Sequence, residues 1–428
     1  MISPKQKKIL EKFDNLPISE KQLEILSFPY SPYDALICDG AVRSGKTSIE
    51  VVAFIDWAMR EFSGQRFGIC GKTVKSATEN MITPYIAMYY AKKRYTLRWR
   101  SSKQILEVRR GRKVNFFEVF GGRDESSFAL IQGRTLAGVL LDEVVLMPES
   151  FVNQALSRCS VEGARIWFSC NPGNPNHWFK REWIDKREER NALYLHFEMT
   201  DNPSLSDKTL ERYQSMYSGV FYDRYIRGLW VVAEGLVYDF FNDSMIVDEI
   251  PWQALQRGKW FLSVDYGTVN PTAAGLWCLW KGTAYMTGEY YYDSRAEDEN
   301  GHGKNPRRTD EEHYAELEKL AGDRRIERVI VDPSAASFKE TIQRHGRFPV
   351  WDADNRVLDG IRLTAALLKS GRILIHRSCK GLISEMGQYV WDTEAKEDAV
   401  IKEFDHSEDQ LRYFCATIME REVRRNGI

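Results

Sequence analysis

An eight-residue stretch, GAVRSGKT at 40–47, has the residue types and the spacing of a phosphate-binding loop. Its two required glycines let backbone N–H groups approach phosphate oxygens, its lysine supplies positive charge to the terminal phosphates, and its threonine supplies a hydroxyl for Mg²⁺. The residues expected to contact the nucleotide are Gly40, Arg43, Ser44, Gly45, Lys46 and Thr47. The pattern predicts a site for ATP with Mg²⁺.

Two acids follow an apolar run in the sequence GVLLDE at 138–143. Such a run predicts a buried strand that ends at Asp142 and Glu143. Asp142 is the expected carboxylate on the metal side of the nucleotide, and Glu143 is the expected general base that polarises the attacking water. The paired acids favour a hydrolysing ATPase over a small-molecule kinase.

Further polar and cationic residues extend this candidate site. Ser169 and Asn171 end the strand predicted at 165–171, where they could sense the γ-phosphate. An ordinary Asn-Pro-Gly turn accounts for the same residues equally well. Arg43 and Arg134 are both candidates for the arginine that stabilises charge on the transferred phosphoryl group. The sequence does not distinguish an arginine acting in its own subunit from one acting on a neighbour.

Three aspartates in the C-terminal half fall on separate predicted elements. Asp265 lies in an apolar strand, Asp332 ends another, and Asp409 lies on a helix three residues after His406. A carboxylate inside an apolar strand is costly unless it is paired or binds a metal. We expect the three to form a cage for two Mg²⁺ or Mn²⁺ ions that promote attack on a phosphodiester. For any one of them alone, an ordinary strand-end or helix-capping acid is the favoured explanation.

Predicted strands alternate with helices over residues 35–200. The strand candidates are 35–40, 66–71, 114–120, 138–143, 165–171 and 193–199. This alternation predicts an α/β fold with a mainly parallel sheet, to which residues 97–120 add short antiparallel strands.

The chain changes character after residue 200, where helices around Gly219 give way to irregular chain. Three consecutive antiparallel strands are then predicted at 260–267, 273–280 and 284–294, followed by a β-α-β-α pattern that is typical of a ribonuclease-H-like fold. We therefore expect domains at 1–200 and 256–428, joined by a helical junction at 201–255.

Composition limits the class of protein. The 428 residues carry 60 basic and 61 acidic side chains, so no overall positive charge indicates nucleic acid. Basic clusters do occur at 92–94, 109–113, 307–308 and 421–425; solvated surface is the usual explanation, and a DNA contact would need them on one face.

Cysteines and apolar runs indicate the compartment. The seven cysteines include no C-x-x-C pair and read as buried side chains in a reducing compartment. No apolar run is long enough to cross a membrane, so we expect a soluble cytosolic protein without a membrane partner.

Several stretches occur together in one order along the chain: DGAVRSGKT, LLDEV, SCNPGNP, DRYIRGLWVVAEGLVYDFF, VDYGTVNPTAAG, VIVDPS and HSEDQLRY. In this order the chain resembles the large terminase subunit of tailed double-stranded DNA phages over nearly its whole length. The junction stretch is the most specific, because nothing in P-loop chemistry requires it. The resemblance implies an N-terminal P-loop ATPase domain of the RecA/ASCE-like kind and a C-terminal ribonuclease-H-like nuclease domain.

The same resemblance implies a DNA-packaging motor. ATP hydrolysis would drive duplex DNA through the portal into the procapsid, and the nuclease would cut the concatemeric genome. The implied partners are double-stranded DNA, the portal protein, a small terminase subunit and further copies of the chain in a ring on the portal, with a monomer as an option for the free protein. The implied location is the host cytoplasm and not the mature virion.

Roles at particular positions follow from the resemblance. The loop at 40–47 matches the Walker A motif, the acids at 142–143 match Walker B, and residues 169–171 match the motif that couples hydrolysis to movement. Gln22 is the candidate adenine-reading glutamine, and Gln6 is its rival.

The implied nuclease carboxylates are Asp265, Asp332 and Asp409, and His406 lies where some family members have a histidine near the metals. One departure is Ala41, where many members carry a further glycine. It puts little in doubt, because both required glycines are present.

Two other classes of protein share part of these features. A cellular DNA helicase or translocase with a non-catalytic adaptor domain would keep the loop and the paired acids but would not need the three aspartates together. A regulatory P-loop protein would bind nucleotide without hydrolysing it, and Glu143 argues against that interpretation.

Overall fold

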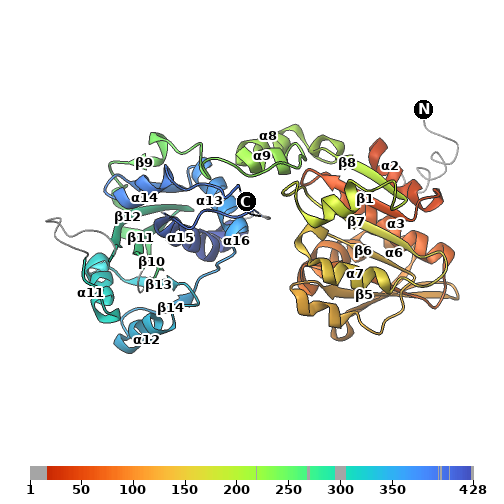
Figure 1. The fold of residues 1–428 in the computed structure, drawn as a ribbon, viewed down its shortest axis with the longest axis horizontal. Coiled ribbons are helices and arrows are strands. Elements are labelled where there is room, and N and C mark those ends of the chain that lie inside the picture. Colours follow the sequence, from red (N-terminus) through yellow and green to blue (C-terminus); the bar gives the residue numbers. More distant parts are fainter. Residues whose placement is uncertain are drawn as a thin grey trace. The chain divides into compact units, whose positions relative to one another are not determined.

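The computed structural model describes residues 17–217, 219–267, 270–294, 305–393, 395, 398–403 and 405–425. The chain divides into two compact units (Figure 1). The first comprises Met1–Gln214 and Val220–Val232, and the second comprises Ser215–Gly219 and Ala233–Ile428. The junction expected at 201–255 is therefore shared between the units, because the boundaries fall after Gln214 in α8 (Asp207–Met216) and after Gly219 in α9 (Gly219–Tyr225).

The first unit is built on a sheet that, in the described part of the chain, has eight strands in the order β3-β4-β5-β2-β6-β7-β1-β8. These strands are β1 (Ala35–Gly40), β2 (Arg66–Gly71), β3 (Thr96–Arg100), β4 (Ile105–Arg110), β5 (Lys113–Gly121), β6 (Gly138–Leu141), β7 (Arg165–Ser169) and β8 (Ala192–Phe197). Strands β5, β2, β6, β7, β1 and β8 pair in parallel, whereas β3, β4 and β5 pair antiparallel. The predicted mainly parallel sheet with an antiparallel addition is confirmed.

Two predicted strands end earlier than expected. Strand β6 stops at Leu141 and β7 stops at Ser169, so the polar residues that follow leave the sheet at its carboxyl edge. Glu143 takes a left-handed conformation, with φ 55° and ψ 45°, which ends the extended run. Because parallel strands end at one edge, these polar side chains collect beside the loop that follows β1.

Helix α3 (Lys46–Glu61) holds the phosphate-binding loop against this sheet. Its Phe54 lies 5.8 Å from Phe67 and 5.7 Å from Trp167, measured between ring centroids, and Trp57 lies 5.7 Å from Phe67. These edge-on aromatic contacts form much of the core on this side of the sheet. The other helices of the unit are α2 (Glu20–Ser27), α4 (Val74–Ala77), α5 (Thr83–Ala87), α6 (Tyr89–Arg94) and α7 (Glu149–Ser157), with the π-helical turn η3 (Thr78–Ile82) between α4 and α5.

The second unit has its own sheet, which in the described residues has the order β14-β13-β10-β11-β12-β15-β9. Its strands are β9 (Ile246–Val247), β10 (Lys259–Asp265), β11 (Thr272–Trp280), β12 (Thr283–Tyr292), β13 (Ile326–Val331), β14 (Val350–Asp352) and β15 (Ile373–His376). Strands β10, β11 and β12 are consecutive and antiparallel, and β13 pairs in parallel with β10. This is the predicted ribonuclease-H-like arrangement.

Helix α15 (His406–Phe414) packs on this sheet, where Phe414 stacks on Trp277 of β11 with centroids 4.3 Å apart. Every side chain from Ser407 to Phe414 is buried, including the acids Glu408 and Asp409. The remaining helices are α10 (Trp252–Arg257), α11 (Asp310–Ala321), α12 (Ala336–His345), α13 (Val357–Lys369), α14 (Lys380–Met386) and α16 (Glu420–Arg425), with the π-helical turn η10 (Cys415–Met419) before α16. Among the described residues, no helix is both long and apolar enough to span a bilayer.

Candidate active sites

The phosphate-binding loop connects β1 to α3 and depends on glycine at both ends. Gly40 has φ 125°, and a Cβ there would lie 1.9 Å from the carbonyl oxygen of Phe197. Gly45 has φ 83° and is the N-cap of α3. A side chain at either position would be strained, so these glycines allow the backbone to turn tightly and to present its N–H groups at the start of the helix.

Lys46 lies folded into this loop. Its Nζ donates to the carbonyl oxygens of Gly40 and Ala41 at 3.0 and 2.7 Å, to Ser44 Oγ at 3.2 Å and to Asn171 Oδ1 at 3.3 Å. Burial lowers the pKa of Lys46. The ammonium is thus positioned at the mouth of the loop, where a phosphate oxygen is the partner it suits best.

The metal side of the site joins the start of α3 to the ends of β6 and β7. Thr47 Oγ1 donates to Asp142 Oδ1 at 2.8 Å and lies 3.4 Å from Ser169 Oγ. Burial raises the pKa of Asp142. A threonine hydroxyl and a carboxylate this close are the hard oxygen donors that suit Mg²⁺.

These groups line one pocket of about 480 Å³. The sequence-predicted residues that line it are Arg43, Ser44, Gly45, Lys46, Thr47, Asp142, Glu143, Ser169 and Asn171. Glu143 faces it from a left-handed backbone conformation that is costly for a residue with a side chain, and such strain is concentrated at functional sites. Sequence reasoning missed Asn80 and Asn202, which also line the pocket and lie in polar segments that carry no motif.

The glutamine candidates are only partly described. Gln22 is buried on α2 and donates from Nε2 to the carbonyl oxygen of Ser44 at 3.3 Å, while its Oε1 accepts from the backbone of Ser19. It therefore contacts the phosphate-binding loop from outside, without lining the pocket. Gln6 lies outside the described residues.

The two arginine candidates differ in position. Arg43 has φ 59°, lines the nucleotide pocket, and has its guanidinium 5.9 Å from the ring of Tyr213. Arg134 does not line the pocket; it lies 3.5 Å from Glu118, and its side chain is 47% exposed. Of the two candidates, Arg43 is the one that lines the nucleotide pocket of its own subunit.

Glu50 is a buried acid behind the pocket that sequence reasoning missed. It lies on α3 one turn after the loop and is fully buried. Burial raises its pKa to about 8, and the nearby Asp142 adds to the shift. Nothing in the sequence separates it from the surface acids of an amphipathic helix.

The junction segment packs directly on the loop. Val42 donates its backbone N–H to the carbonyl oxygen of Tyr225 at 2.9 Å. Gly228 has φ 71°, and a Cβ there would lie 3.0 Å from both Gly40 Cα and Ala41 N. The stretch that is most specific in the sequence therefore contacts the nucleotide loop itself.

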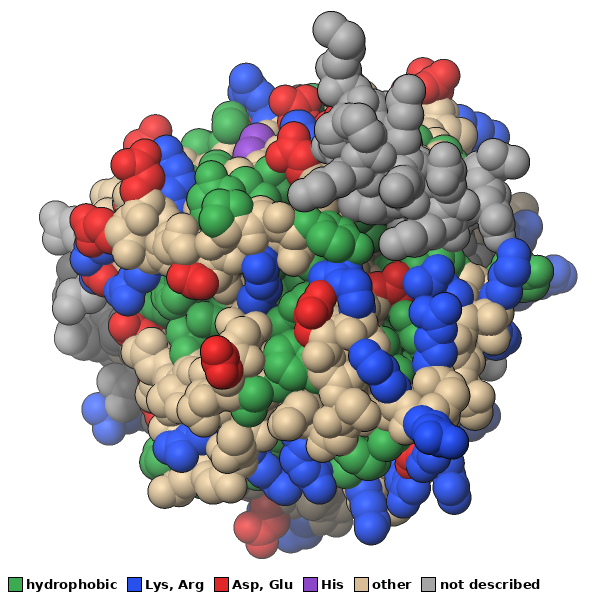
Figure 2. Space-filling view, turned by 90° about the vertical axis from the view of Figure 1, so that its right-hand side faces the viewer, with side chains coloured by type: hydrophobic (Ala, Val, Ile, Leu, Met, Phe, Trp, Pro, Cys, Tyr) green, Lys and Arg blue, Asp and Glu red, His purple; other side chains and the backbone are tan. Residues whose placement is uncertain are grey.

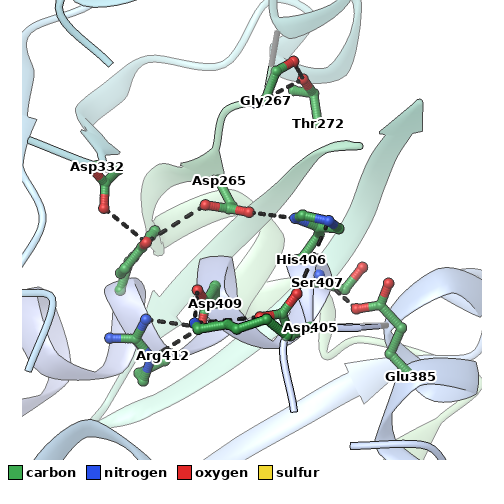
Figure 3. Close-up of polar contacts among 12 residues, drawn as sticks. Asp265, Gly267, Thr272, Asp332, Glu385, Asp405, His406, Ser407, Asp409 and Arg412 are labelled. Atoms are coloured by element: carbon green, nitrogen blue, oxygen red, sulfur yellow. Dashed lines mark hydrogen bonds and ion pairs between the residues drawn. The ribbon is translucent and has the colours of Figure 1, made fainter. Parts of the chain in front are cut away.

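The second candidate site lies at the ends of β10 and β13 in the second unit (Figure 3). The hydroxyl of Tyr413 donates to Asp332 Oδ2 at 2.8 Å and lies 3.5 Å from Asp265 Oδ1, so it stands between the two carboxylates. His406 Nδ1 lies 2.8 Å from Asp265 Oδ2. These two aspartates come together as predicted, and Tyr413 is a member of the site that was missed.

Asp409 has different neighbours. Its Oδ1 accepts from Arg412 Nη2 at 2.8 Å, and its Oδ2 lies 3.6 Å from Lys402 Nζ, which is also 3.3 Å from Asp405 Oδ2. Within the described part of the chain, no three His, Cys, Asp or Glu side chains are arranged to bind a metal ion. Asp409 is thus in contact with Arg412 and Lys402, and the cage expected for Asp265, Asp332 and Asp409 stays a prediction.

The two facing aspartates are electrostatically different. Burial raises the pKa of Asp265. Partial burial acts the same way on Asp332, but hydrogen bonds from Ser334 and Tyr413 outweigh it and lower the pKa of that carboxyl. Burial opposes charge on His406, yet the hydrogen bond to Asp265 raises its pKa. Two oxygen donors on adjacent strands suit Mg²⁺ or Mn²⁺.

Comparison with known proteins places this arrangement in a family. The structure of the large terminase from a thermophilic bacteriophage is 46% identical, with a TM-score of 0.87, and the match covers 94% of this chain and all of that one. The chain belongs to the large terminase family. The family described as terminase large subunit, T4likevirus-type, N-terminal, matches residues 37–244.

Two further comparisons bear on this large terminase. The same thermophilic-phage protein in complex with ADP is also 46% identical, with a TM-score of 0.85 over 94% of this chain and all of that one. The large subunit of the terminase of Escherichia phage T5 is 23% identical over 297 residues, which cover 66% of this chain and 65% of the T5 protein. The match thus spans about two thirds of that curated relative.

Proposed function

We propose that this large terminase hydrolyses ATP in its first unit to move double-stranded DNA, and cuts DNA in its second unit with divalent metal ions. The observation that carries the proposal is the contact of Thr47 with Asp142 at 2.8 Å, in the pocket that also contains Lys46 and Glu143. A related protein, the large terminase of the thermophilic bacteriophage, has been seen with ADP and with ATP-γ-S.

Each residue of the first site has a proposed part in hydrolysis. Lys46 and Arg43 would bind and stabilise the phosphates, and Thr47 and Asp142 would hold Mg²⁺. Glu143 accepts the proton of the attacking water, while Asn171, which already contacts Lys46, reports the state of the γ-phosphate. Gln22 would act on the nucleotide indirectly, through its contact with the loop.

In the second site, Asp265 and Asp332 would hold Mg²⁺ or Mn²⁺, which supplies Lewis acidity for phosphodiester attack. Asp409 is the proposed third ligand, and its present contacts are with Arg412 and Lys402. His406 orients Asp265 through its 2.8 Å contact. The proposed partners are double-stranded DNA, the portal protein, a small terminase subunit and further copies of the chain in a ring, with the work done in the host cytoplasm.

Two measurements on the full chain test the proposal. Phosphate release, with and without DNA, should occur in the wild type and be lost with Glu143→Gln. Cleavage of a plasmid with Mn²⁺ should occur in the wild type and be lost with Asp265→Asn. ATP turnover without any metal-dependent cutting would favour a translocase with a non-catalytic second unit, and nucleotide binding without turnover would favour a regulatory P-loop protein.

A further inference from the structure

Two basic clusters that lie apart in the sequence, at 92–94 and 109–113, meet at a second pocket of the first unit. The pocket has a volume of about 490 Å³ and is lined by Arg94 of the first cluster and by Arg110 and Lys113 of the second. Figure 2 looks onto this unit from the right-hand side of Figure 1 and shows Lys and Arg side chains gathering on part of that face. Neither the ATPase nor the nuclease proposal uses these residues.

The pocket lies at the far end of α3 from the nucleotide. Its lining includes Asp56, Trp57 and Arg60 from the last turns of the helix, whereas Lys46 begins it. At 1.5 Å per residue, Arg60 is about 20 Å from Lys46 along the helix axis. The two pockets share no lining residue, and we call this one the α3-end pocket.

Positive charge dominates the α3-end pocket. Four basic side chains line it, and Asp56 is the one acid among its lining residues. Asp56 is already engaged, because it accepts from the hydroxyls of Tyr90 and Tyr95 at 2.5 and 2.8 Å and lies 3.5 Å from Arg94 Nη2. Its carboxylate is therefore not free to compensate the charges of Arg110 and Lys113.

Two guanidinium groups in the lining each have one unsatisfied hydrogen-bond donor. Arg60 Nη2 and Arg94 Nε are buried and make no hydrogen bond within the described residues. Arg60 is otherwise held in place, since its Nε pairs with Glu61 at 2.5 Å, its guanidinium lies 4.2 Å from the ring of Tyr30, and its carbonyl oxygen accepts from Lys113 Nζ. Buried donors are almost always satisfied, so these two indicate a missing acceptor.

We propose that the α3-end pocket binds a phosphate group. Phosphate oxygens accept several charge-assisted hydrogen bonds at once, and arginine matches their geometry. The volume exceeds that of a free phosphate ion, so the group belongs either to a nucleotide or to the backbone of DNA running across the pocket. This site is independent of the P-loop, and its proposal does not depend on ATP turnover or cleavage.

The test compares two double variants with the same loss of charge. Arg60→Gln with Arg110→Gln removes two lining cations, whereas Lys103→Gln with Arg112→Gln removes two exposed neighbours that do not line the pocket. Both are measured in the full chain without Mg²⁺, and melting temperatures check folding. If the first pair does not fold, Arg110→Glu alone, at an exposed position, replaces it.

Two arms distinguish the sources of phosphate. In the first, anisotropy of a labelled duplex is followed against salt; DNA binding should weaken about tenfold in the pocket variant, with the salt slope falling by about 2, and change little in the control. In the second, inorganic phosphate and ADP are titrated calorimetrically in a Lys46→Ala background, where only the pocket variant should lose binding.

Loss in the first arm assigns the pocket to the DNA backbone, and loss in the second assigns it to a small phosphate ligand. Equal behaviour of the pocket and control variants in both arms overturns the proposal. Because neither arm requires turnover, failure of the motor proposal would show separately, in phosphate release and plasmid cleavage.

Discussion

The indole of Trp230 donates its N–H to Asp39 Oδ2 at 2.7 Å. Asp39 is a fully buried acid of β1, directly before the phosphate-binding loop, and its other oxygen lies 3.0 Å from His196 Nδ1. That hydrogen bond raises the pKa of His196. One carboxylate thus ties the tryptophan of the junction to the strand that leads into the nucleotide site.

Trp230→Phe should remove this donor while keeping an aromatic ring. A buried carboxylate that loses one partner costs about 1–3 kcal/mol, so the melting temperature should fall and ADP binding should weaken with it. Differential scanning fluorimetry and ADP titration measure the two effects. Trp252→Phe is the control, because Trp252 is 68% exposed. Equal melting of the two variants would show that the Trp230 contact contributes nothing.

Glu143→Gln should abolish ATP turnover while retaining ATP binding, because the amide fits the same space but accepts no proton. Lys46→Ala should lose turnover and weaken binding, since it removes charge from the phosphates. Steady-state phosphate release and nucleotide titration separate the two cases. Turnover by Glu143→Gln at the wild-type rate would contradict its assignment as the general base.

The buried acid Glu50 predicts a pH-dependent stability difference. Its pKa of about 8 in the folded protein lies above the unfolded value near 4.5, so the folded state binds the extra proton between these pH values. Wild-type stability should therefore fall relative to Glu50→Gln as pH rises from 5 to 8.5, by an amount on the order of a few kcal/mol. Melting of both proteins across this range, without nucleotide or metal, gives the difference. A pH-independent difference would show that Glu50 titrates normally.

Arg43 and Arg134 can be assigned by mixing variants. If Arg43 acts within its own subunit, as its place in the pocket favours, no mixture should restore ATP turnover to Arg43→Ala. If Arg134 acts on a neighbour, Arg134→Ala mixed with Glu143→Gln should recover turnover at mixed interfaces. The readout is ATPase activity against mixing ratio. Rescue of Arg43→Ala by an added variant would reverse the preference.

Asp265→Asn should abolish Mn²⁺-dependent plasmid cleavage and leave ATP turnover intact, because the two sites lie in different units. Asp409→Asn should have the same effect, whereas Asp405→Asn and Asp398→Asn should matter less. Loss of cleavage with Asp405→Asn but not with Asp409→Asn would move the third ligand to Asp405, which shares Lys402 with it. Undiminished cleavage by Asp265→Asn would contradict the assignment of a metal site to Asp265 and its neighbours.

The positions of the strands along the chain and the nucleotide loop could be predicted because each depends on local pattern. Alternating apolar runs identify the strands, and the glycines of the loop are required by backbone geometry at Gly40 and Gly45. Side-chain pairing across elements has no such signature. Three features depend on which faces of the elements meet after folding: the partners of Asp409, the bridging hydroxyl of Tyr413 and the burial of Glu50. No local sequence pattern indicates which faces these are.

The missing methyl group at Gly228 has a mechanical consequence. A single added carbon would lie 3.0 Å from the backbone at Gly40 and at Ala41, so there is no clearance between the junction and the loop at this point. Val42 is also joined to Tyr225 by a backbone hydrogen bond. A shift of the loop backbone toward the junction would therefore displace Gly228 as well.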